Sequence, residues 1–424
     1  MRIAIVTLFA AIMSQACLAE DWSSFRGSNG NGFATESTLP QQWSENEGVR
    51  WSVDLPRGGN GSPIVVGDRV LVTSAEDDEG HQRTLLCLDA KSGDTMWNRT
   101  VSIEEKMPTH KTNPYAGTTP ASNGDVVVVW HGSAGLHAYD MDGQPLWSAD
   151  LGTYRHLWGY GTSPVIVGDR VVLHTGPGEN VYVVAFDIRS GKELWRHEEP
   201  VDGDGERNSE GKYMGSWSTP VIIQRKDKHI AVCAMSTRVC GLDTASGELL
   251  WFCEGLSGPK GDLAYSSPMI EDDLCVVAGG FQGPSIGFRL PATVEPVGNI
   301  TSQSRLWRNE RNPQSIGTGL LHGGYVYRPG AGPNLIECIR ADSGEIVWQE
   351  RVGSKAFWGS MVFDGTHAMV TNQAGTTILF RPSPKQFDKV AENPLGDTCN
   401  ATPAVKDDTI YIRTYKKLWC VDGA

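Results

Sequence analysis

Several features that mark other protein classes are missing from this chain of 424 residues. It has no run rich in lysine and arginine, and its net charge is −13, so nucleic acid is not expected as a partner. Beyond the first 19 residues, no stretch is apolar enough to span a bilayer. The nine cysteines include no adjacent pair and no Cys-x-x-Cys-His haem-attachment sequence.

Motifs for nucleophilic or metal chemistry are also missing. There is no Gly-x-Ser-x-Gly elbow, no P-loop and no His-x-x-x-His pair. The acidic segment 201–211 (VDGDGERNSEG) resembles a calcium loop, but Arg207 stands where the EF-hand spacing from Asp202 requires glycine. We therefore predict a solvated loop there, and the sequence assigns no catalytic residue and no metal site.

The first 19 residues read as a signal peptide. Arg2 gives a small positive start, residues 3–13 are apolar, and Cys17-Leu18-Ala19 forms a small-x-small cleavage site. A lipid anchor on Cys17 is the alternative, but Ser14 stands where a lipobox usually has leucine. We expect an exported protein, periplasmic or extracellular, with residues 1–19 removed.

One phrase, FDIRSGKELW at residues 186–195, returns along the chain. Copies stand at residues 88–97, 139–147, 242–251 and 339–348, the last with Arg340 in place of aspartate. Alternating apolar residues predict a strand, Ser-Gly a turn, and the tryptophan an outer strand that docks onto the next unit. The tryptophans assigned this structural role are Trp51, Trp97, Trp147, Trp195, Trp251, Trp307 and Trp348.

Each repeat also opens with an apolar strand, usually after Ser/Thr-Pro as at Ser62-Pro63 or Thr219-Pro220. With a second strand and the hairpin, this makes four antiparallel strands per repeat, the composition of a propeller blade. Segments 315–321 and 358–363 lack the proline, and 380–387 (FRPSPKQF) replaces one hairpin. An insertion between Phe288 and Trp307 is predicted to be a surface loop.

The last repeat starts at Thr402 and has only three strands, whereas segment 49–56 has a tryptophan but no hairpin. The N-terminal strand is therefore predicted to complete the last blade and close the ring. This gives an all-β, eight-bladed propeller at residues 49–424, after an irregular strap over the surface at 20–48. We expect a monomer, because a closed ring leaves no obvious dimer edge.

Eight cysteines remain after removal of the signal peptide, mostly within apolar strand patterns. Export would permit disulfides, whereas a buried free thiol behaves as a small hydrophobe. Cys233 and Cys240 flank an expected hairpin turn and could face each other. A bridge between them and two free thiols both remain open.

Residues 185–195 closely resemble the Ala-x-Asp-x-x-Thr-Gly-x-x-x-Trp phrase of the pyrroloquinoline quinone (PQQ)-type β-propeller repeat family. Segments 22–27 (WSSFRG) and 130–140 (WHGSAGLHAYD) are similar to exported bacterial proteins of that family. The family includes quinoprotein alcohol and sugar dehydrogenases and an outer-membrane assembly lipoprotein. The resemblance thus implies the fold but does not select an activity.

Quinoprotein dehydrogenases of this family use a vicinal Cys-Cys disulfide, a stacking tryptophan and calcium ligands around the quinone. No two cysteines are adjacent here, and the calcium ligands cannot be matched residue by residue. No cofactor is therefore firmly predicted. PQQ with calcium belongs to the alternative reading, an oxidoreductase of alcohols or sugars without the usual disulfide.

Two sets of loops should meet on one face of the propeller, where aromatic and amide side chains suit a ligand site. Trp217, Tyr265 and Trp358 could instead be packing between blades. The candidate residues of this funnel face are His110, Asn113, Tyr115, His131, Arg155, His156, Trp158, Tyr160, Trp217, Tyr265, Trp358, Asn372, Gln373, Asn400 and Arg413.

The expected function is binding or scaffolding in the cell envelope, without catalysis. The partner would be a protein, peptide or glycan, held on the funnel face or along an exposed blade edge. The PQQ-dependent oxidoreductase is the first alternative. A purely structural envelope component is the second.

Overall fold

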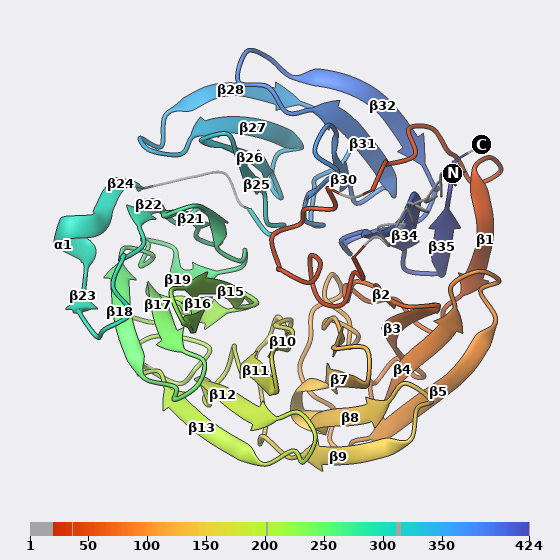
Figure 1. The fold of residues 1–424 in the computed structure, drawn as a ribbon, viewed down its shortest axis with the longest axis horizontal. Helices are drawn as coiled ribbons and strands as arrows, with labels where there is room; N and C mark the ends of the chain where they lie inside the picture. The colour runs from red at the N-terminus through yellow and green to blue at the C-terminus, as the bar shows by residue number, and fades with distance from the viewer. Residues whose placement is uncertain (1–19, 36, 201, 311–314, 424) are drawn as a thin grey trace, which may run out of the picture.

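The computed structural model describes residues 20–35, 37–200, 202–310 and 315–423, so the segment read as a signal peptide, with Cys17, lies outside the described residues. Apart from the helix α1 (Thr301–Ser304) and a 3-10 turn at Gly132–Ala134, the regular elements described are strands. Eight blade sheets are arranged in a ring (Figure 1), and a ninth, two-stranded sheet accompanies them in the described part of the chain. The prediction of an all-β, eight-bladed propeller is confirmed.

The first four blades follow one another along the chain, each numbered from the inner to the outer strand. They are β2 (Ile64–Val66), β3 (Arg69–Ala75), β4 (Gln82–Asp89) and β5 (Thr95–Ser102); β6 (Ala121–Ser122), β7 (Val126–Trp130), β8 (Leu136–Asp140) and β9 (Pro145–Ala149); β10 (Val165–Val167), β11 (Arg170–His174), β12 (Tyr182–Asp187) and β13 (Glu193–Glu198); and β15 (Val221–Arg225), β16 (Lys228–Ala234), β17 (Arg238–Asp243) and β18 (Leu249–Glu254).

The last four blades repeat this order. They are β20 (Met269–Glu271), β21 (Leu274–Ala278), β22 (Ser285–Arg289) and β24 (Arg305–Asn309); β25 (Leu320–His322), β26 (Tyr325–Pro329), β27 (Leu335–Arg340) and β28 (Ile346–Arg351); β29 (Val362–Phe363), β30 (Ala368–Thr371), β31 (Thr376–Arg381) and β32 (Asp388–Pro394); and β33 (Ala404–Lys406), β34 (Thr409–Arg413), β35 (Lys417–Val421) and the N-terminal β1 (Val49–Asp54).

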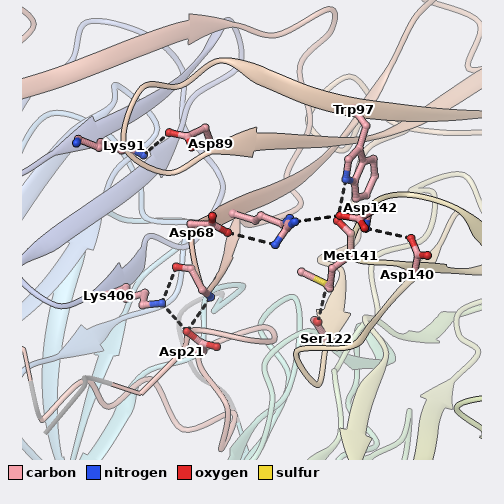
Figure 2. A network of polar contacts seen from close by, with 12 residues as sticks. Asp21, Asp68, Asp89, Lys91, Trp97, Ser122, Asp140, Met141, Asp142 and Lys406 are labelled. Carbon is pink, nitrogen blue, oxygen red and sulfur yellow. Dashed lines mark hydrogen bonds and ion pairs between the residues drawn. The ribbon is translucent and has the colours of Figure 1, made fainter.

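The two ends of the chain close the ring as predicted. Strand β1 pairs antiparallel with β35 and is the outermost strand of the last blade. A polar contact adds to this closure: Lys406 Nζ donates to Asp21 Oδ1 and to the carbonyl of Gly67, each at 2.6 Å (Figure 2). The last blade, the N-terminal strap and the first blade are thereby tied together.

The recurring phrase joins each blade to the next. Trp97 Nε1 donates to the carbonyl of Met141 in the following blade at 3.0 Å (Figure 2). Gly143, whose φ is 78°, lies against the same indole, and a Cβ there would come within 2.7 Å of the ring. Glycine is thus required both for the turn and for the close approach of the tryptophan.

The same Nε1-to-carbonyl bond is made by Trp51, Trp147, Trp195, Trp307 and Trp348. Trp348 reaches Ser383 at 2.9 Å, within the segment where the usual hairpin is replaced. The ring of Trp251 packs against Phe288, with centroids 5.9 Å apart. The aspartate of the phrase holds the turn: Asp89 accepts the N–H groups of Lys91 and Ser92, which lowers the pKa of its carboxyl.

The insertion between Phe288 and Trp307 is more ordered than the predicted surface loop. Its short strand β23 (Gly298–Asn299) pairs in parallel with β18 of the preceding blade. The blade β15–β18 therefore has five strands. Leu290 and Ile300 of the insertion are buried and belong to the same apolar cluster as Leu250 of β18. The prediction was wrong because apolar residues spaced irregularly along a loop gave no strand pattern. Sequence also did not indicate the parallel pair of β14 (Tyr213–Ser216) and β19 (Gly261–Ala264).

The N-terminal strap is irregular but does not simply lie over the surface. In Figure 1 it runs, in red, across the middle of the ring. Trp22 and Trp43 are buried, and Arg26 is 1% exposed. The guanidinium of Arg26 donates to the carbonyls of Asn31 at 2.8 Å and Gly319 at 2.6 Å. These bonds tie the strap to Gly319, the residue before β25.

The cysteine alternatives resolve toward free thiols. Cys233 and Cys240 face each other in the β16–β17 register, but both are free and buried. Burial raises the pKa of each thiol. The other six described cysteines are likewise free and buried.

A candidate ligand cavity in the central channel

A belt of eight serine and threonine side chains surrounds the channel at the start of the blades. The backbone N–H of each residue donates to the hydroxyl of the corresponding residue in the next blade, for example from Ser62 to Thr119 Oγ1 at 2.9 Å. Seven of the eight steps are bonded in this way. The belt consists of Ser62, Thr119, Ser163, Thr219, Ser267, Thr318, Ser360 and Thr402.

The remaining step lies between Thr219 and Ser267. The hydroxyl of Ser267 is buried and has no hydrogen-bond partner among the described residues. The belt also explains the two repeats without proline, since Thr318 and Ser360 take the same position there. The hydroxyl, and not the proline that usually follows it, is what all eight blades share.

Next to the belt is a cavity of about 400 Å³. Seven predicted funnel-face residues line it: His110, Asn113, Trp158, Trp217, Tyr265, Trp358 and Asn400. The N-terminal strap contributes Phe25 to its wall. Sequence reasoning missed Phe25, Asn60, Thr112, Phe281, Ile316 and the belt, although the recurrence of Ser/Thr-Pro was a usable signal for the belt.

One wall of the cavity is aromatic. Trp217 lies with its ring centroid 5.2 Å from Tyr265 and 5.8 Å from Trp158. Its Nε1 donates to the carbonyl of Gly159 at 2.9 Å, and the buried ring of His156 meets it edge-on at 4.9 Å. These contacts fix the orientation of the indole, so the wall offers flat apolar faces at defined angles.

Next to the aromatic wall, the cavity is lined by side-chain amides that are hydrogen-bonded to one another and to neighbouring backbone groups. Asn113 Nδ2 donates to the carbonyl of Trp158 at 2.8 Å, and its Oδ1 accepts from Asn60 Nδ2 at 3.1 Å. Asn400 accepts from Gln373 Nε2 at 3.1 Å and donates to the hydroxyl of Tyr415 at 3.0 Å. Both N–H donors of Asn60, Asn113 and Asn400 are used within this network, so these amides offer a ligand the free lone pairs of their oriented oxygens.

The side chains that line the cavity carry no permanent charge. None of its lining residues is aspartate, glutamate, lysine or arginine. Burial raises the pKa of Tyr265, so its hydroxyl stays protonated at neutral pH. Aromatic faces, amides and hydroxyls without fixed charge can hold an uncharged ligand by stacking and hydrogen bonding.

The other predicted funnel-face residues do not line the cavity: Tyr115, His131, Arg155, His156, Tyr160, Asn372, Gln373 and Arg413. Most support the structure from behind the wall; Tyr160, for example, is buried and bonds to the carbonyl of Tyr115. Arg413 is buried and donates to the carbonyl of Gly61 at 2.8 Å. Arg155 is exposed and pairs with Glu105. Loop assignment alone could not separate the residues that face the channel from those that turn away.

In the described part of the acidic loop, aspartate carboxylates are bonded within the loop, whereas Glu206 accepts the N–H of Leu157. Asp204 Oδ1 accepts the N–H groups of Glu206 and Arg207, and these bonds lower the pKa of its carboxyl. Within the part of the chain that the structure describes, no three His, Cys, Asp or Glu side chains converge as metal ligands do. That part also holds no helix of the length and apolarity needed to span a bilayer.

Comparison with known proteins gives two groups of relatives. The outer membrane protein assembly factor BamB of Burkholderia pseudomallei is 23% identical over 370 residues, covering 78% of this chain and 87% of that protein. The quinohemoprotein alcohol dehydrogenase ADH-IIG of Pseudomonas putida is 29% identical over 181 residues, which are 39% of this chain and 23% of that protein.

A solved structure gives the same fold. The quinohemoprotein alcohol dehydrogenase of Comamonas testosteroni superposes with a TM-score of 0.68 at 12% identity, over 97% of this chain and 82% of that one. The family described as "Outer membrane protein assembly factor BamB" matches residues 34–116 and 84–350. The resemblance to PQQ-type repeat propellers is thereby confirmed, and this chain belongs to that BamB family.

Proposed function

We propose that this protein is an exported binding propeller that holds an uncharged ligand, a neutral glycan or an uncharged peptide segment, in its funnel cavity. The observation that carries the proposal is the composition of the cavity wall. Trp158, Trp217 and Tyr265 offer stacking faces, whereas Asn60 and Asn113 offer oriented amide oxygens, and none of the lining residues is aspartate, glutamate, lysine or arginine. In binding sites of this kind, apolar side chains provide most of the contact area and a few polar groups fix the orientation of the ligand.

A place in the cell envelope is part of the proposal. The start of the chain has the pattern of a signal peptide, and one relative is named for outer membrane protein assembly. We propose that the ligand belongs to an envelope partner and that the propeller acts as a rigid scaffold for it. A purely structural component would bind no ligand in the cavity.

The residues of the cavity do not fit PQQ with calcium. Calcium is held by six to eight oxygen ligands that include carboxylates, and none of the lining residues has a carboxylate. PQQ itself carries carboxylates, and no arginine or lysine lines the cavity to pair with them. We therefore derive no redox step for this chain.

Calorimetric titration of the mature protein tests the proposal. Neutral oligosaccharides and uncharged peptides are titrated in parallel with PQQ plus calcium. We expect saturable heat with at least one neutral ligand and none with PQQ. Tight stoichiometric heat with PQQ would overturn the proposal in favour of the oxidoreductase.

Two exposed apolar residues provide a matched pair of variants for this titration. Phe281 lines the cavity and is 40% exposed, whereas Met96 on the outer edge of the first blade is 43% exposed. Phe281→Ala should weaken neutral-ligand binding about tenfold, the scale of one lost stacking contact. Met96→Ala should leave it unchanged, and equal effects would place the ligand outside the cavity.

A further inference from the structure

The outer edges of the blades share an apolar residue at one position. In five blades, the residue immediately before the docking tryptophan is a large hydrophobe that is exposed. These residues are Met96 (43%), Leu146 (45%), Leu194 (41%), Leu306 (43%) and Val347 (36%). Single exposed hydrophobes are ordinary, but chance exposure does not explain their recurrence at one repeat position, on edge strands that pair with no further strand among the described residues.

The blade β15–β18 has the same pattern, and it shows how this position can be covered by an added strand. Leu250, before Trp251, is fully buried because residues 290–300 of the same chain cover it. The covering segment adds a strand to the edge: Val297 N–H donates to the carbonyl of Leu250 at 2.7 Å, and Ile300 N–H to that of Phe252 at 2.9 Å. Figure 1 shows this strand, β23, outside β18.

We propose that the outer edge of β28 binds an extended segment of a partner protein as an added parallel strand, in the way that β18 binds β23. Main-chain hydrogen bonds supply affinity in such pairing, and an apolar side chain of the partner covers Val347. This surface lies on the perimeter of the ring, away from the funnel cavity, and does not depend on the ligand there.

Strand β28 is the free edge that fits this mode best. Ile346 and Val347 are adjacent and 44% and 36% exposed, so the edge offers two apolar contacts. By alignment on the tryptophan, Val347, Gln349 and Arg351 take the places of Leu250, Phe252 and Glu254. In β18 the N–H of Glu254 is also bonded, to Thr301 Oγ1 at 2.9 Å. The edge of β24 is less open, because Arg305 reaches across to the carbonyl of Glu254.

The probe for this surface is a fluorescent peptide with the sequence of residues 294–301 (VEPVGNIT), added to the intact mature protein. Fluorescence anisotropy should show saturable binding, and hydrogen exchange should slow in segment 345–351. The control peptide carries N-methyl groups on the residues equivalent to Val297 and Ile300, which removes the two donors seen in β23. We expect it to bind at least tenfold more weakly.

Substitutions in β28 test whether the peptide binds at the outer edge of this strand. Val347→Lys should weaken peptide binding at least tenfold by placing a charge against the added strand. Glu350→Gln changes an exposed residue of the same strand and should leave binding unchanged. A variant with residues 291–303 replaced by a short Gly-Ser linker vacates β18 and should bind additional peptide there.

Three results would overturn the proposal. Peptide binding that requires the vacated β18 would show that this edge alone accepts a strand. Equal affinity for the N-methylated peptide would exclude main-chain pairing. A concentration-dependent oligomer of the protein that Val347→Lys dissociates would assign the edge to a second copy of this chain.

Discussion

The backbone N–H of Thr402 donates to the Oγ of Ser62 at 3.0 Å, across 340 residues of sequence. This bond joins the last blade to the first, so the belt continues across the two ends of the propeller and its one unbonded step lies between Thr219 and Ser267. It acts at the inner side of the ring, while β1 and β35 close the outer side. The first and last blades are therefore joined both near the centre of the ring and at its perimeter, and no open sheet edge is left where they meet.

Removal of the belt hydroxyl at this join should destabilise the fold. Ser62→Ala leaves the buried N–H of Thr402 without an acceptor, and we expect a loss of about 1–3 kcal/mol in the free energy of unfolding, measured in urea. Ser267 has the same belt position but a hydroxyl without a partner. Ser267→Ala should therefore change stability by less than about 0.5 kcal/mol. Equal losses would show that the belt bonds do not stabilise the ring.

The turn glycines of the repeat separate backbone strain from packing. Gly191 and Gly168 have φ of 67° and 57°, so alanine is strained at both, by about 1–2 kcal/mol. A Cβ on Gly191 would lie 2.5 Å from the ring of Trp147, whereas one on Gly168 meets nothing within 4 Å. Gly191→Ala should cost about 1–3 kcal/mol more than Gly168→Ala in urea unfolding. The idea that this glycine seats the tryptophan fails if the two variants are equally stable.

Stability should fall as the pH drops below the usual range of histidine. Burial lowers the pKa of His131, His156 and His174, so they stay neutral in the folded protein while the unfolded chain takes up protons below about pH 6.5. The stabilisation is thus complete above that pH and is lost on acidification. Each histidine adds a slope of about 1.4 kcal/mol per pH unit while only the unfolded form is protonated.

Urea unfolding between pH 5 and pH 7.5 measures this slope. His174→Gln should reduce it by about one histidine's share, whatever its effect on absolute stability. Gln42 is exposed and has no titratable group, so Gln42→Ala serves as the control that should leave the slope unchanged. An unaltered slope in His174→Gln would mean that His174 is protonated in the folded protein.

The N-terminal strap should depend on Arg26. Arg26→Met removes the donors to Asn31 and Gly319 and leaves buried carbonyls unpaired, so we expect a loss of about 2–3 kcal/mol and faster hydrogen exchange in residues 20–35. Arg57 is the matched control, because it is exposed and pairs with exposed Asp78. Arg57→Met should cost less than about 1 kcal/mol. Unchanged exchange in Arg26→Met would show that other strap residues hold the segment.

The functional site was predictable in part. The aromatic residues Trp158, Trp217 and Trp358 precede blade-opening strands, and a closed propeller brings such loops to the channel. His131 and Tyr160 come from the same kinds of loop yet are buried behind the wall. Loop direction depends on packing between blades, which no local pattern records.

By itself, the sequence determined the architecture, because each copy of the Asp–Gly–Trp phrase specifies a strand, a turn and a tryptophan that packs on the next blade. The unmatched Trp51 and the three-stranded last repeat likewise specified the closure. Tertiary structure decided the contacts that follow no repeat in the sequence: Phe25 lines the channel, Leu250 is covered by residues 290–300, and the hydroxyl of Ser267 is the one in the belt that accepts no bond from the preceding blade. These contacts join residues far apart in the chain, and their geometry exists only once the ring has closed.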